Sequence, residues 1–114
     1  MPLLSIETNA EIPAERRAEI VKNASRRVAE LLGKPERYVM VTLRPNSHMC
    51  FAGEDTPLAY LELKSIGLPE GSTSELSAAL CELIQDQLGI PADRVYIEFS
   101  NAERHLWGWN GGTF

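Results

Sequence analysis

In the first half of the chain, successive segments show the hydrophobic pattern of a strand, then that of a helix, then that of a second strand. Residues from Pro2 to Glu7 have the pattern of a short apolar strand. From Pro13 to Leu32 the apolar residues recur at spacings of three and four, which is typical of one buried helical stripe. Proline in the first turn and Gly33 after the last residue mark the ends of this helix. The β-branched, nearly continuously apolar stretch from Tyr38 to Leu43 predicts a second strand.

The second half follows the same plan. Its pattern predicts a strand from Leu58 to Ile66 and a turn over residues 67–71. A helix follows and ends before Gly89, and the spacing of Ser72 and Glu75 is that of a capping box at its start. A last strand is predicted over residues 95–99, and residues 107–114 form a glycine-rich aromatic tail.

These two halves also match residue by residue. Pro2, Leu3 and Glu7 align with proline, leucine and glutamate at an offset of 55 positions. Each predicted helix ends in the motif Leu-Gly-x-Pro, at residues 32–35 and 88–91. The chain is therefore predicted to be a tandem duplication of about residues 2–56 and 57–114 within one domain, 1–114.

A strand-helix-strand unit makes a parallel strand pair joined by a right-handed crossover. Two fused units predict an α+β fold in which a four-stranded mixed sheet carries two helices on one face. The stretch from Tyr38 to Leu43 is apolar on both sides of a strand, so the uncovered face is expected to expose an apolar patch. That patch predicts self-association through sheets that pack on the sheets of other copies.

Composition narrows the class of protein. With 114 residues, 44% of them hydrophobic, the chain can bury a modest core. A net charge of -5 without a basic stripe argues against a nucleic-acid partner. No secretory signal or membrane-spanning run occurs, so the cytoplasm is the expected compartment, with secretion without a signal peptide as the alternative. Cys50 and Cys81 are both expected to be reduced.

The residue with the most distinctive chemistry is Pro2. Removal of Met1, which a small second residue favours, would leave a secondary amine at the head of an apolar strand. A free α-amino group titrates near about 7.7 to 8.0, and burial lowers that pKa. Such an amine can act as a general base or a nucleophile. No metal or other cofactor is expected, because His48 and His105 are far apart and lack ligand spacing.

Short motifs occur in a characteristic order along nearly the whole chain: Met1-Pro2, Gly33-Lys34-Pro35, Tyr38, Pro57, Ser65-Ile66-Gly67, Asp93 to Ile97, and Gly108-Trp109-Asn110. Together they resemble the macrophage migration inhibitory factor family and its tautomerase relatives. That resemblance implies a homotrimer in which three sheets form an inner barrel, with a pocket at each subunit interface.

The resemblance also implies keto-enol tautomerase activity on aromatic α-keto acids of the phenylpyruvate type, with the Pro2 amine as the base. Carried over by position, Lys34 would bind the substrate carboxylate and Ile66 would offer its backbone N–H. Tyr96 from a neighbouring subunit would close the pocket. Further positions that line or approach it are Tyr38, Lys64, Ser65, Trp109 and Phe114.

Three departures from the vertebrate family members affect the expected chemistry. Residues 58–61, Leu-Ala-Tyr-Leu, replace a Cys-x-x-Cys motif and exclude thiol-disulfide chemistry there. Glu98 replaces an asparagine, and its carboxylate is expected either to repel acidic substrates or to raise the pKa of the amine. Trp107 replaces a smaller residue and is expected to narrow the pocket mouth.

Two other kinds of function remain open on the sequence. One is a cytokine-like protein that binds a cell-surface receptor and keeps the pocket as a relic. The other is a trimeric scaffold with neither activity. An enol-formation assay on the wild type and on Pro2→Gly separates the enzyme from both.

Overall fold

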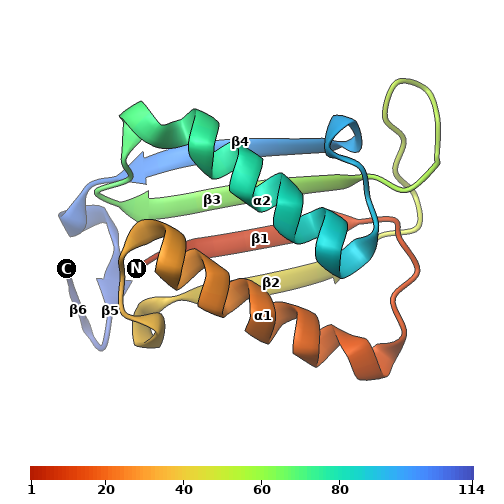
Figure 1. Cartoon of the computed structure of the whole chain (residues 1–114). Helices are drawn as coiled ribbons and strands as arrows, with labels where there is room; N and C mark the ends of the chain where they lie inside the picture. Colours follow the sequence, from red (N-terminus) through yellow and green to blue (C-terminus); the bar gives the residue numbers. More distant parts are fainter.

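The computed structural model describes residues 1–114, and a four-stranded sheet forms its centre (Figure 1). Strand order is β2-β1-β3-β4. Strand β1 (Leu3–Thr8) runs parallel to β2 (Met40–Pro45) and antiparallel to β3 (Ala59–Ile66), which is parallel to β4 (Val95–Ala102). The predicted α+β fold with a mixed sheet is confirmed.

Both long helices lie on the same face of the sheet (Figure 1). Helix α1 (Ala14–Leu32) connects β1 to β2, and α2 (Thr73–Leu88) connects β3 to β4. Each ends at a glycine in the left-handed conformation, Gly33 with φ 61° and Gly89 with φ 70°. Glycine adopts this conformation without the steric cost of a Cβ atom, so both Leu-Gly-x-Pro motifs end their helices in the same way. Neither helix is long and apolar enough to cross a membrane.

Four single turns of 3-10 helix and a small hairpin complete the chain. The turns span Glu36–Tyr38, Glu70–Ser72, Ala92–Arg94 and Arg104–Leu106. The hairpin pairs β5 (Gly108–Trp109) with β6 (Gly112–Thr113). Figure 1 places this hairpin beside the chain's N-terminus, at one end of the sheet. The core lies between sheet and helices, and its fully buried members include Leu4, Leu61, Val28, Leu80 and Ile90.

The expected apolar patch on the uncovered face is wrong. Side chains alternate across a strand, so β2 turns Val41 and Leu43 toward the helices and leaves Met40, Thr42 and Arg44 on the open face. Of these only Met40 is a large exposed hydrophobic residue, 63% exposed. The neighbouring strands add charged and polar side chains to this face: Ser5, Glu7, Tyr60, Glu62, Lys64 and Glu98.

Several local predictions also need correction. Tyr38 belongs to a 3-10 turn after Pro35, so the second strand begins at Met40. Strand β4 continues past Phe99 to Ala102. Ser72 does precede α2, but its side chain makes no capping hydrogen bond, because residues 70–72 form a 3-10 turn that leads into the helix. Both cysteines are free, and Cys81 is half-buried rather than buried.

Candidate active site

A cavity of about 400 Å³ lies beside the first residues of β1. Pro2 is buried in its wall, and its carbonyl oxygen accepts a hydrogen bond of 2.9 Å from the Met40 N–H. This bond starts the β1–β2 ladder and fixes the backbone of Pro2 at the end of the sheet. The predicted base thus lies directly before β1, with its carbonyl group paired to β2.

Three aromatic rings form one wall of this cavity. Tyr38 meets Trp109 and Phe114 edge-on, with ring centroids 5.7 and 5.8 Å apart, and the last two rings stack at 5.5 Å. The Phe114 N–H donates to the Trp107 carbonyl at 3.1 Å, which folds the chain end back over the pocket. Trp107 also lines the cavity, as expected. The site therefore suits a flat apolar ligand.

Lys34 follows the end of α1 and extends to the end of β3. Its Nζ atom donates to the Ile66 carbonyl oxygen at 3.1 Å. Ser65, fully buried, donates its hydroxyl to the same oxygen at 3.1 Å. These three predicted residues therefore meet at one carbonyl group. Ser65 takes part through that bond, on the helix side of the strand.

The environment of the N-terminal amine suits a base. Burial lowers the pKa of the Met1 amino group, and the positive charge of Lys34 lowers it further. In this structure the amine belongs to Met1. Removal of Met1 would transfer it to Pro2, whose side chain is buried in the cavity wall. Lys34 also has the charge that would hold a substrate carboxylate near this amine.

Five of the predicted site residues do not line this cavity: Lys34, Ser65, Ile66, Lys64 and Tyr96. Lys64 stands opposite Leu3 in the sheet, and its Nζ pairs with a Glu62 oxygen at 3.3 Å. Tyr96 is at the other end of the sheet, where it stands opposite Tyr60 and is 65% exposed. A single chain therefore does not bring Tyr96 to Pro2.

One cation that lines the cavity is not indicated by the sequence pattern. Arg37 lines the same cavity as Pro2, and its guanidinium lies 4.7 Å from the centroid of the Tyr38 ring. It has no carboxylate within salt-bridge distance. In the sequence, its position next to Tyr38 is the one feature that connects Arg37 to the site. The direction of its side chain depends on the 3-10 turn Glu36–Tyr38, which the sequence pattern does not predict.

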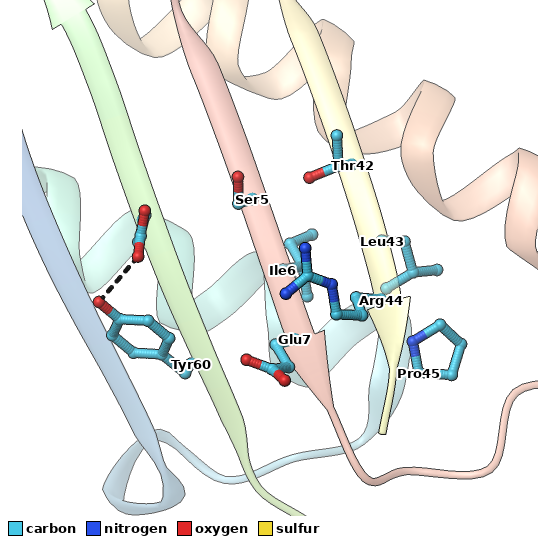
Figure 2. Close-up of a pocket in the computed structure, with 9 residues that line it drawn as sticks. Ser5, Ile6, Glu7, Thr42, Leu43, Arg44, Pro45 and Tyr60 are labelled. Atoms are coloured by element: carbon cyan, nitrogen blue, oxygen red, sulfur yellow. Dashed lines mark hydrogen bonds between the residues drawn. The ribbon is translucent and has the colours of Figure 1, made fainter. Parts of the chain in front are cut away.

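Another hollow, of about 420 Å³, lies on the open face of the sheet, and Figure 2 shows the residues that line it. Its walls combine hydrophobic residues with polar ones. Arg44 extends over β1, and the Tyr60 hydroxyl contacts Glu62 at 3.1 Å and Glu98 at 2.6 Å. Hydrogen bonding to Glu98, followed by burial, raises the pKa of Tyr60, and the bond to Lys64 lowers that of Glu62. No group of three or more histidine, cysteine or carboxylate side chains is placed to hold a metal ion.

A duplicated β-α-β sheet with an aromatic pocket at its proline-headed first strand is the architecture of the tautomerase superfamily. Comparison with known proteins identifies one family within this superfamily. The family model described as macrophage migration inhibitory factor (MIF) matches residues 1–114. The chain belongs to this family.

Relatives match over the full length. A macrophage migration inhibitory factor homolog of Brugia malayi is 40% identical over 117 residues, covering 100% of this chain and 99% of the relative. The Mus musculus macrophage migration inhibitory factor is 36% identical over 118 residues, with the same coverage. The crystal structure of a homologue from Prochlorococcus marinus superimposes with a TM-score of 0.91 at 45% identity, covering 98% of each chain. The structure of the macrophage migration inhibitory factor from Trichinella spiralis superimposes with a TM-score of 0.89 at 33% identity, covering 98% of this chain and 99% of that chain.

Proposed function

We propose that this protein is a keto-enol tautomerase for aromatic α-keto acids of the phenylpyruvate type, with the Pro2 amine as general base once Met1 is removed. Membership of the MIF family supports an isomerase of this general kind. The observation that carries the finer proposal is the burial of Pro2 in an aromatic-walled cavity, next to an amine whose pKa is lowered by burial and by Lys34.

In the proposed reaction, the neutral amine removes a proton from the carbon next to the substrate carbonyl. The electron pair of that C–H bond forms the C=C bond, and the π pair of the C=O bond moves to oxygen. The oxygen takes up a proton from water to give the enol, and the protonated amine returns its proton to water. Lys34 and Arg37 would hold the carboxylate, while Tyr38, Trp109 and Phe114 contact the ring. Fixing both ends of the substrate places the acidic carbon near the base, which is the larger part of such catalysis.

We propose a homotrimer as the active form, in which Tyr96 of one copy closes the cavity of the next. Its position supports this arrangement. Tyr96 is exposed and lies at the end of the sheet opposite to Pro2, so only another copy can bring it to the cavity. The polar open face agrees with an assembly whose contacts run along strand edges and loops, because burying the charges of that face would be costly.

Enol formation from phenylpyruvate by the wild type and by Pro2→Gly tests the function. Intact mass first establishes that Met1 is absent from both samples. Loss of a positioned general base should lower kcat by a factor on the order of 10² to 10⁴. Equal rates would refute the role of Pro2. Absence of activity from the wild type would refute the proposal as a whole.

A second candidate, a cytokine-like protein that binds a cell-surface receptor, is favoured by one observation, the full-length match to the murine macrophage migration inhibitory factor. The wild type and Pro2→Gly also distinguish the tautomerase from the receptor ligand. A receptor ligand with a vestigial pocket would show no enol formation, and its binding to macrophage surfaces would survive Pro2→Gly.

A further inference from the structure

Arg94, in the 3-10 turn that precedes β4, makes several hydrogen bonds to the loop between β2 and β3, which Asn9 also contacts. Its Nη1 donates to the Phe51 carbonyl at 2.7 Å, and its Nη2 to those of Glu54 and Thr56 at 3.2 and 2.9 Å. Its Nε donates to the Pro57 carbonyl at 3.4 Å. Four of its five N–H donors therefore bond to the main chain of a single loop. No carboxylate forms a salt bridge with it.

This loop needs such support, because its tip is a tight turn. Phe51 and Glu54 exchange two backbone hydrogen bonds, of 2.9 and 3.1 Å. Between them Ala52 and Gly53 have φ values of 56° and 76°. Left-handed backbone at a residue with a Cβ costs about 1 to 2 kcal/mol, so Ala52 disfavours this turn. The bonds from Arg94 to the carbonyls on either side of it hold the turn in place.

Phe51 links the loop to Tyr96. Its ring lies 5.2 Å from the Arg94 guanidinium on one side and 4.6 Å, centroid to centroid, from the Tyr96 ring on the other. These rings border a hollow of about 470 Å³ lined by hydrophobic residues, among them the loop residues Met49 and Cys50. Tyr96 itself is 65% exposed, so Phe51 is the aromatic neighbour that restricts its orientation.

We propose that Arg94 is a positioning residue, which locks the loop of residues 51–57 and, through Phe51, presents Tyr96 in one orientation. The inference rests on the proposed function, in which Tyr96 closes the cavity of a neighbouring copy. Arginine suits the task because its planar fork reaches several carbonyl groups at once, whereas a lysine ammonium would act as a point charge. Arg94 therefore affects substrate affinity rather than proton transfer, since Pro2 belongs to a different part of the chain.

The test compares Arg94→Ala and Arg94→Lys with the wild type, and uses Arg16→Ala as the matched control. Arg16 also donates to a distant carbonyl, that of Gln87 at 3.1 Å, but lies away from the loop. Hydrogen exchange over residues 51–57 should become roughly tenfold faster in both Arg94 variants and stay unchanged in the control. KM for phenylpyruvate should rise about five- to tenfold, with kcat within about twofold.

Chemical rescue separates a positioning role from a general loss of stability. Millimolar guanidinium chloride, but not sodium chloride, should lower the KM of Arg94→Ala toward the wild-type value. If Arg94→Ala does not fold, Phe51→Leu keeps the loop and removes the ring against Tyr96, and it should raise KM in the same way.

Failure of this inference is distinguishable from failure of the proposed function. An active wild type whose KM is unchanged in Arg94→Ala, or whose loop exchange is unchanged, would overturn the role of Arg94 alone. Recovery of the wild-type KM by Arg94→Lys would also overturn it, because charge alone would then suffice. An inactive wild type would overturn the proposed function and, with it, the link from Tyr96 to substrate.

Discussion

The Nζ atom of Lys34 donates to the carbonyl oxygen of Ile66 over 3.1 Å. This bond joins the two β-α-β units, because Lys34 follows α1 and Ile66 ends β3, the first strand of the second unit. It also keeps the lysine charge near the start of β1, where that charge lowers the pKa of the N-terminal amine. One contact thus places a cation next to the proposed base.

Lys34→Gln should weaken binding of acidic substrates. Glutamine is one bond shorter than lysine but remains polar and similar in size, so the variant removes the charge with a small change in volume. A hydrogen bond to a charged group contributes about 1.5 to 3 kcal/mol, which corresponds to a rise in KM for phenylpyruvate of roughly 10- to 100-fold. Steady-state kinetics measure the change in KM, and Lys22→Gln, at an exposed position, is the control. An unchanged KM would remove Lys34 from the site.

The same variant should shift the pH dependence of the reaction. Lys34 lowers the pKa of the Met1 amine, and we expect the same direction for the Pro2 amine once Met1 is removed. Neutralising Lys34 should then raise the pKa of the Pro2 amine and leave less of the neutral base at a given pH. The acidic limb of the kcat/KM profile should therefore move to higher pH in Lys34→Gln. Burial, the larger cause, remains, so the pKa stays below that of a free amine. A shift toward lower pH would contradict this assignment.

Arg37→Gln tests the second cation of the cavity. The side chain lies over the Tyr38 ring and has no acidic partner, so it is available to an anionic ligand. We expect KM for phenylpyruvate to rise about three- to tenfold, less than for Lys34, because an exposed charge is screened by solvent. The effect should shrink at high salt. Arg26→Gln, on the exposed surface of α1, serves as the control and should leave KM unchanged.

Tyr60 should ionise at higher pH than a free tyrosine. Its bond to Glu98 is the first cause of the raised pKa, followed by burial and by the bond to Glu62. Because the folded-state pKa lies above the unfolded one, this contribution to stability is complete below pH 10 and declines above it. Ultraviolet difference titration of the wild type against Tyr60→Phe isolates the group. A normal midpoint in that difference would refute the hydrogen-bond arrangement.

Thr8→Val should destabilise the fold by about 1 to 3 kcal/mol, although the two side chains have nearly the same shape. The buried Thr8 hydroxyl donates to the Leu58 carbonyl at 2.7 Å and accepts from the Ala10 N–H at 3.1 Å. Valine leaves both backbone groups without this partner. Urea denaturation measures the loss, and Thr8→Ser should retain most of the stability. Equal stability of the two variants would indicate that water replaces the hydroxyl.

Local periodicity predicted much of the fold. The stripe of α1 and the glycine ends at Gly33 and Gly89 depend on interactions within a few residues, so the sequence reveals them directly. The four main strands are visible as short apolar runs, although their pairing joins distant parts of the chain. Boundaries were less certain. Tyr38 has the side chain of a strand residue, yet the turn after Pro35 places it outside β2 and in the cavity wall.

For the candidate site too, some features follow from the sequence and others only from the tertiary structure. By itself, the sequence determined the duplicated β-α-β plan, the helix ends and the proline that heads the first strand, because each is encoded by neighbouring residues. The tertiary structure decided that Lys34 meets Ile66, that Arg37 faces the cavity, that Arg94 fastens a loop 37 to 43 positions away, and that the open face is polar. Such contacts join residues that are distant in the chain, and their geometry exists only after the strands have paired and the helices have packed on them.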